Sequence, residues 1–187
     1  LVPMIVKVEG RENIDKKQSY IVLTNHQSAY DIFLVYGWLG VDLKWIMKKE
    51  LRKVPGLGVA SEKVGHIFLD RSNNRAALES LENARKKLVN GTSVVVFPEG
   101  TRSKTGIPGP FKRGGFKLAI DLRLPILPVT LINTRNILPA DSFNIFPGLV
   151  KMVIHKPIDI SDIDEKEMNE LVEKVKSIIC SSLPDYH

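Results

Sequence analysis

The sequence is poor in cysteine. Cys180 is the one cysteine in the chain, which excludes an internal disulfide and a cysteine-based zinc site. It lies in an apolar helical pattern, so we expect it to fill space in the core. A reducing, cytosolic environment is consistent with this composition.

Long hydrophobic runs are absent as well. No stretch of about 18 apolar residues is uninterrupted, so no transmembrane helix is predicted. The most apolar segment, residues 32–47, contains Asp42 and Lys44. No signal peptide is predicted at Leu1, and a membrane anchor upstream of it stays open. Because no repeat or low-complexity tract divides the chain, we expect a single domain over residues 1–187.

The charge that is present is mainly basic. With 43% hydrophobic and 26% charged residues, the composition is that of a folded chain. The formal charge of +6 favours a polyanionic partner, either nucleic acid or an anionic bilayer. No nucleic-acid motif or metal-ligand spacing is recognised. We therefore expect no nucleic-acid partner and no metal.

Short apolar runs alternate with helical patterns. Ser28 followed by Asp31 predicts a capping box that opens a helix. The alternation predicts an α/β fold with a mixed, largely parallel sheet flanked by helices. Strands are predicted over residues 20–24, 65–71, 93–97, 126–132 and 151–155, and helices over 28–39, 73–89, 114–123 and 164–183.

The first candidate site is the segment 25–31, NHQSAYD. It places His26 at the end of a strand and Asp31 in the first turn of the next helix. Such a pair suits general-base catalysis, because a carboxylate on one imidazole nitrogen fixes the tautomer and steadies the imidazolium. The alternative is that Asp31 only caps the helix and His26 fills a turn.

The second candidate is the segment 97–103, FPEGTRS, which follows a buried strand. Charged groups emerge there at the end of the sheet where α/β folds bind ligands. Arg102 could clasp a phosphate, and Glu99 could orient it or accept a hydrogen bond from a substrate hydroxyl. Gly100 permits a tight turn beside a ligand. A solvated Glu–Arg pair is the alternative.

A third segment, residues 65–71 (GHIFLDR), is another short strand that ends in a charged pair. Arg71 is the candidate for a second phosphate ligand, whereas His66 is expected to be a filler. The alternative is that Asp70 and Arg71 interact only with the dipole at the start of the following helix.

Together, NHQSAYD, GHIFLDR, FPEGTRS and the later PILPVT (residues 125–130) resemble the glycerolipid acyltransferases, specifically the lysophosphatidate acyltransferases. The resemblance covers about residues 6–130 and implies a glycerol-phosphate acyltransferase-like fold. It implies that His26 deprotonates the free hydroxyl of lysophosphatidate and that Asp31 orients His26. Acyl-CoA or acyl carrier protein would be the co-substrate, with no other cofactor. Arg71 and Arg102 would hold the phosphate, with Glu99, Gly100 and Thr101 shaping the floor of the site.

Neither an acyl-enzyme nor a serine nucleophile is expected, because the sequence has no Gly-x-Ser-x-Gly elbow. The group that stabilises the oxyanion is not identified; a backbone amide or Lys104 is a candidate. Residues 55–58 (PGLG) are candidates for the acyl-chain tunnel. Other acceptors, such as glycerol 3-phosphate or another lysolipid, stay open, as do a thioesterase and a non-catalytic lipid-binding module.

The segment 44–54 mixes basic and apolar residues, including Trp45, and suits the interface of an anionic bilayer. We therefore expect the protein at the cytoplasmic face of the membrane, peripheral or anchored by an upstream segment. The alternative is a stripe packed on the domain with its lysines in water. The loop 104–113, with Lys112 and Arg113, is a second candidate contact for phosphates or carrier protein.

Overall fold

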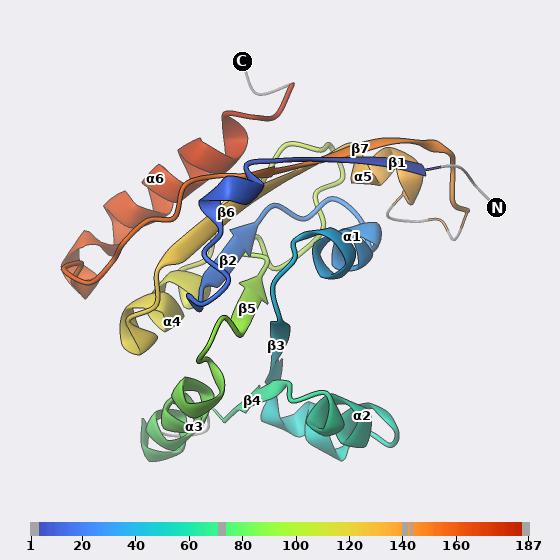
Figure 1. The fold of residues 1–187 in the computed structure, drawn as a ribbon. Helices are drawn as coiled ribbons and strands as arrows, with labels where there is room; N and C mark the ends of the chain where they lie inside the picture. Colours follow the sequence, from blue (N-terminus) through green and yellow to red (C-terminus); the bar gives the residue numbers. More distant parts are fainter. Residues whose placement is uncertain (1–3, 71–73, 140–141, 143, 185–187) are drawn as a thin grey trace.

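A seven-stranded sheet organises the protein (Figure 1). The computed structural model describes residues 4–70, 74–139, 142 and 144–184. The strand order is β1-β7-β6-β2-β5-β3-β4. The strands are β1 (Met4–Glu9), β2 (Ile21–Thr24), β3 (Leu43–Lys48), β4 (Ile67–Leu69), β5 (Ser93–Val96), β6 (Ile126–Ile132) and β7 (Gly148–Ile154).

The sheet is mixed, as predicted. All neighbouring pairs are parallel except β6 and β7, which are antiparallel. The carboxyl ends of β2, β5, β3 and β4 therefore point the same way, which brings the segments that follow them to one edge. The predicted fold class is confirmed.

Helices cover both faces of the sheet (Figure 1). On one face, α3, α4 and α6 enclose a core that includes Phe116, Ala84 and Ile179. On the other, α1 and α5 pack over a second core that includes Leu34 and Ile137. Each fully buried large apolar side chain contributes about 1.5–3 kcal/mol relative to exposure. The helices are α1 (Tyr30–Trp38), α2 (Leu57–Lys63), α3 (Asn74–Lys87), α4 (Gly114–Leu122), α5 (Thr134–Ile137) and α6 (Met168–Cys180), with 3-10 turns η1 (Arg11–Asn13), η2 (Lys49–Lys53) and η3 (Glu165–Glu167).

Several elements were not predicted from the sequence: β1, β3, α2 and α5. Residues 57–58, suggested as part of an acyl tunnel, form the start of α2. Trp45 and Ile46 lie in β3, where Ile46 packs against the first core and Trp45 against the second. For these two side chains, packing on the domain is therefore observed, and not the predicted bilayer contact.

The capping box at the start of α1 forms only in part. The Asp31 carboxylate accepts a hydrogen bond from the Ser28 amide at 2.9 Å, but the Ser28 hydroxyl accepts from the Tyr30 amide at 3.0 Å. The helix consequently begins at Tyr30 rather than at Ser28.

Candidate active site

His26 and Asp31 meet in the link between β2 and α1. Nδ1 of His26 lies 2.8 Å from Oδ2 of Asp31, whose side chain is fully buried. The same oxygen accepts the amide hydrogens of Gln27 at 2.7 Å and Ser28 at 2.9 Å. Because an ionised carboxylate only accepts, Nδ1 of His26 carries the proton and Nε2 presents a lone pair. The pair therefore has the arrangement of an oriented general base.

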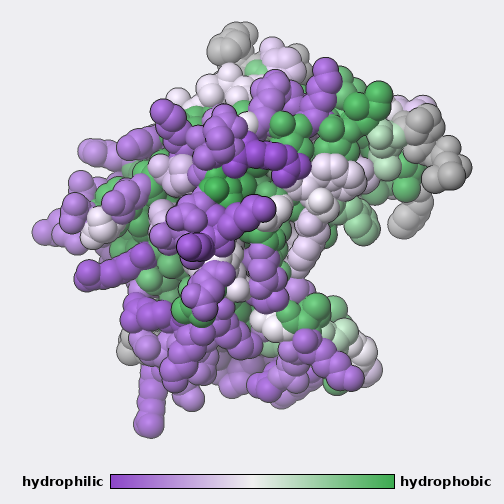
Figure 2. Space-filling view, viewed as in Figure 1, coloured by the Kyte–Doolittle hydropathy of each residue, from purple (hydrophilic) through white to green (hydrophobic). Residues whose placement is uncertain are grey.

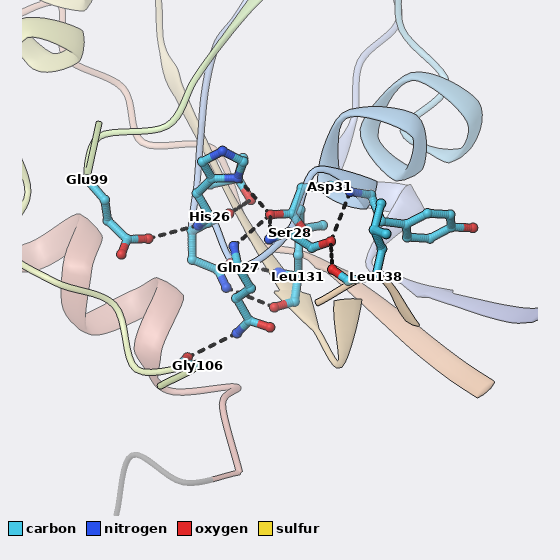
Figure 3. Close-up of polar contacts among 11 residues, drawn as sticks. His26, Gln27, Ser28, Asp31, Glu99, Gly106, Leu131 and Leu138 are labelled. Atoms are coloured by element: carbon cyan, nitrogen blue, oxygen red, sulfur yellow. Dashed lines mark hydrogen bonds and ion pairs between the residues drawn. The ribbon is translucent and has the colours of Figure 1, made fainter. Parts of the chain in front are cut away.

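The loop after β5 holds the backbone of His26 at two points. The His26 amide donates to Oε1 of Glu99 at 2.8 Å, and the His26 carbonyl accepts from the Ser103 amide at 2.7 Å. Oε2 of Glu99 accepts from the Gly109 amide at 2.9 Å. Figure 3 shows the carboxylates of Glu99 and Asp31 on opposite sides of His26. Residues 100–102 thus lie on a loop whose two ends are tied to the proposed base.

Glu99 is a structural brace in this arrangement. It is 6% exposed, and burial raises the pKa of its carboxyl, while the amide hydrogen bonds from Gly109 and His26 act in the opposite direction. The sequence prediction gave Glu99 a contact with Arg102 or with substrate. The hydrogen bonds of its two carboxylate oxygens run to backbone amides, and a contact with Arg102 or with substrate stays a prediction.

Asn25 and Gln27, on either side of His26, were not assigned roles from the sequence, and Ser28 was expected only as a helix cap. The Asn25 side chain donates to the Leu131 carbonyl and accepts from the Leu131 amide, both at 2.8 Å, which extends the β2–β6 pairing by one step. Gln27 donates to the Gly106 carbonyl at 3.0 Å, and the Ser28 hydroxyl donates to the Leu138 carbonyl at 2.5 Å (Figure 3). The signal in the sequence was an unbroken polar run immediately after a buried strand.

An aromatic row extends from the imidazole. The rings of His26 and Phe97 stack with centroids 3.9 Å apart and an 18° interplanar angle. Phe97 stacks in turn on Trp45 at 5.7 Å. Aromatic faces at these spacings attract one another and exclude water from the space beside the ring.

An apolar groove of about 370 Å³ opens beside this row. His26 and Lys112 provide polar groups in it, and most of the remaining lining is apolar. A concave, mainly apolar site with a few convergent polar groups is the usual form of a small-molecule site. The other lining residues are Trp45, Ile46, Val95, Val96, Phe97, Pro98, Gly100, Gly114, Gly115 and Leu118.

The ammonium group of Lys112 lies in the groove, against the turn at Gly100. Gly100 has φ of +72°, and a Cβ there would lie 2.6 Å from Nζ of Lys112. The Lys112 amide donates to the Pro98 carbonyl at 2.8 Å, which anchors the lysine beside the turn. Glycine at position 100 therefore serves both the left-handed turn and the close approach of the ammonium group.

The other predicted residues are placed differently. Thr101 and Arg102 are exposed on the tied loop. Lys104, suggested as an oxyanion group, lines a separate cavity with Gln27 and Arg135. Arg71 lies outside the described residues. Within the part of the chain that the structure describes, no group of three or more His, Cys, Asp or Glu side chains could hold a metal ion.

Comparison with known proteins relates this geometry to one family. Residues 5–132 match the family described as Acyltransferase. The chain is 35% identical to a 1-acyl-sn-glycerol-3-phosphate acyltransferase of Cocos nucifera, with 96% of this chain and 58% of that protein covered. It is 37% identical to the Saccharomyces cerevisiae protein of the same name, covering 96% and 60%. It thus spans roughly three fifths of these relatives' length.

A solved structure agrees in fold. The crystal structure of the 1-acyl-sn-glycerophosphate acyltransferase PlsC from Thermotoga maritima superposes with a TM-score of 0.74 at 38% sequence identity. The match covers 94% of this chain and 71% of that one.

Proposed function

Because the chain belongs to the Acyltransferase family, we propose that it transfers a fatty acyl group from a thioester to the free hydroxyl of lysophosphatidate, giving phosphatidate. The observation that carries the proposal is the His26–Asp31 pair, 2.8 Å apart, beside an apolar groove. The names of the relatives support this acceptor.

In the proposed reaction, His26 is the base and the groove beside it holds the acyl chain. Nε2 of His26 takes the proton of the acceptor hydroxyl as its oxygen attacks the thioester carbonyl, and Asp31 stabilises the imidazolium that forms. The C–S bond then breaks, and the leaving thiolate takes the proton back from His26. The groove accommodates the start of the acyl chain against Phe97 and Leu118.

Cations near the base support a phosphorylated acceptor. Lys112 lies in the groove with His26, and Arg102 is carried on the loop tied to it. Hydrogen bonds between cations and phosphate oxygens are stronger than neutral ones. Lys112 thus joins Arg102 and Arg71 as a proposed phosphate ligand.

The donor is proposed to be acyl-CoA or acyl carrier protein, and the protein is proposed to act at the cytoplasmic face of a membrane. No helix among the described residues is both long and apolar enough to cross a bilayer. Leu57 and Val59 are exposed on α2, and Val54 is exposed just before it, next to Arg52 and Lys53. Figure 2 shows hydrophobic surface over this part of the molecule, at the lower right. An apolar and basic surface of this kind suits an anionic bilayer.

Thiol release from palmitoyl-CoA or palmitoyl carrier protein, measured with and without lysophosphatidate, tests the proposal. Release that requires the acceptor and falls by about 10²–10⁴-fold in His26→Ala is expected. Release without acceptor indicates a thioesterase. Faster release with glycerol 3-phosphate than with lysophosphatidate would identify glycerol 3-phosphate as the acceptor. Undiminished turnover in His26→Ala would show that His26 is not the base.

A further inference from the structure

A second cavity lies at the far end of the sheet, where β4 is the edge strand. Its volume is about 430 Å³, and its walls come from α2 with η2, from β4 and from α3. Figure 1 shows β4 between α3 and α2. It shares no lining residue with the groove beside His26. The residues that carry the argument are Arg52, Glu62, His66, Phe68, Lys86 and Lys87.

The cavity has an excess of positive charge. Arg52, Lys86 and Lys87 line it, and Glu62 forms an ion pair with Arg52. The two lysines lie in the last turn of α3, and the surface over α3 is largely hydrophilic in Figure 2. The Lys87 ammonium donates a long hydrogen bond to the His66 carbonyl at 3.5 Å, and no ion pair among the described residues involves Lys86 or Lys87. Both cations can therefore approach an anionic ligand without competition from the Glu62 carboxylate.

The imidazole of His66 adds a neutral donor to the same wall. Its Nδ1 accepts from the Trp45 amide at 3.3 Å, so Nε2 carries the proton. Burial, followed by the charges of Lys44 and Lys87, lowers the pKa of His66. The smaller contribution from Lys87 agrees with the excess of positive charge in the cavity wall.

An aromatic side chain gives the cavity an apolar component. Phe68 is half-buried and lines it together with Ile67. Nucleobases stack on aromatic side chains of this kind. A volume of about 430 Å³ falls within the ordinary range for small-molecule sites. The combination suits an adenine nucleotide that carries a phosphate near the lysines.

The cavity also lies at a suitable distance from the proposed base. Trp45 and Ile46 of β3 line the groove, whereas Ile67 and Phe68 of β4 line the cavity, and Ile46 pairs with Ile67. Three strand spacings separate β2 from β4, so the cavity and the base are at least about 14 Å apart across the sheet, and His66 lies beside Trp45, before the strand ends that carry His26. The extended arm of two linked amides between the thiol and the nucleotide of CoA spans a distance of this order.

We propose that the cavity between α2, β4 and α3 binds the 3′-phosphorylated adenine nucleotide of an acyl-CoA donor, with Lys86 and Lys87 on the phosphate and Phe68 on the base. The proposal rests on the proposed function for the identity of the donor. Concavity and an aromatic wall favour a nucleotide over the flat acidic face of a carrier protein. They also favour it over a lipid phosphate, which would not need the aromatic side chain.

The test is a binding cycle that does not depend on turnover. Isothermal titration compares CoA with dephospho-CoA, which lacks the 3′-phosphate, in the wild type and in Lys86→Gln/Lys87→Gln. The control is Lys166→Gln/Lys174→Gln, which removes the same charge from two exposed positions outside the cavity. We expect the wild type and the control to bind CoA about tenfold more tightly than dephospho-CoA, and the cavity variant to bind both equally.

Several outcomes would overturn the inference. Equal affinities of the wild type for CoA and dephospho-CoA would mean that no site binds the 3′-phosphate. A preference that persists in Lys86→Gln/Lys87→Gln would place that phosphate elsewhere. Unchanged CoA binding, with weaker use of acyl carrier protein or weaker sedimentation with phosphatidate vesicles, would assign the lysines to a protein or lipid contact. If acyl transfer itself failed while the binding cycle held, the proposed function and not the cavity would be wrong.

Discussion

Asp31 uses a single oxygen, Oδ2, to hold both the imidazole of His26 and the backbone that carries it. That oxygen accepts from His26 Nδ1 at 2.8 Å and from the amides of Gln27 and Ser28 at 2.7 and 2.9 Å. Orientation of the base and closure of the β2–α1 link therefore depend on the same atom. Substitutions at position 31 should separate the charge of this group from its geometry.

In Asp31→Asn, the amide oxygen can keep the three bonds while the negative charge is lost. We expect kcat to fall by about 10²-fold or more because the imidazolium is no longer stabilised. The amide nitrogen takes the place of Oδ1, which is buried without a hydrogen-bond partner, so thermal stability should fall by about 1–3 kcal/mol as well. Asp31→Ala should also destabilise the fold, because each buried amide left without an acceptor costs about 1–3 kcal/mol. Steady-state kinetics and thermal unfolding check both variants. Full activity in Asp31→Asn would contradict the proposed role of the charge.

Glu99→Gln replaces one of two oxygen acceptors with an amide nitrogen. Either His26 or Gly109 then loses its partner, so we expect a lower melting temperature and a kcat reduced by about tenfold or more. The Michaelis constant for lysophosphatidate should change little, because Glu99 positions the backbone of His26. A rise in that constant with unchanged kcat would instead support the contact with substrate predicted from the sequence.

Lys112→Gln should raise the Michaelis constant for lysophosphatidate by about tenfold or more, since a charge-assisted contact with its phosphate is lost. Arg113→Gln is the matched control, because the Arg113 guanidinium donates to Asn169 at 2.5 Å, away from the groove. The comparison is made by initial rates over a range of acceptor concentrations. Equal effects of the two substitutions would exclude a specific role for Lys112.

Ile46→Trp should narrow the groove beside His26. We expect kcat/KM for a palmitoyl donor to fall by about tenfold or more, with a smaller loss for a short-chain donor. Ile5→Trp, at a position that is 62% exposed on β1 and does not line the groove, is the control for adding an indole. A loss that does not depend on chain length would show that the acyl chain lies elsewhere.

His155 is expected to make the free energy of unfolding depend on pH, separately from activity. Burial lowers its pKa below 6.5, and its Nε2 lies 2.8 Å from the Thr130 hydroxyl, which donates to the Ile179 carbonyl. The unfolded chain therefore binds this proton more readily, so the free energy of unfolding should fall as the pH drops below about 6.5.

Chemical denaturation between pH 7 and pH 5 measures this effect. His155→Gln keeps a hydrogen-bond donor and should show a shallower loss of stability on acidification. His66→Gln is a useful comparison, because the pKa of His66 is lowered too and its removal should flatten the slope in the same direction. An unchanged slope in both variants would contradict the assignment.

The sequence predicted the parts of the site that depend on local structure. His26 and Asp31 lie five residues apart across one strand-to-helix junction, where the two side chains can meet. The spacing left a capping Asp31 and a filler His26 open, and the other segments of the resemblance supported the pair. The fold class followed from alternating patterns in the same way. The role of Glu99 could not be predicted, because His26 is brought to it only by the pairing of β2 with β5, and Gly109 only by the path of the loop after β5.

The strands β1 and β3 were not predicted for a similar physical reason. The edge strand β1 pairs with β7, which is far away in the sequence. The basic residues around Trp45 suggested a surface, whereas the tryptophan itself packs between Phe97 and Tyr36. Burial of this kind is decided by neighbouring strands and not by the local pattern.

The tie between Asn25 and Leu131, 106 positions apart, has a consequence for biosynthesis. During translation, the segment that carries His26 emerges long before β6, whose Leu131 binds Asn25. Leu138, which accepts the hydrogen bond from Ser28, emerges later still. Until β6 has been translated, β2 presents an unpaired apolar edge, the kind of surface that chaperones protect in nascent chains. Catalytic competence should therefore arise late and in one step during translation, so that a stalled ribosome would release no active fragment.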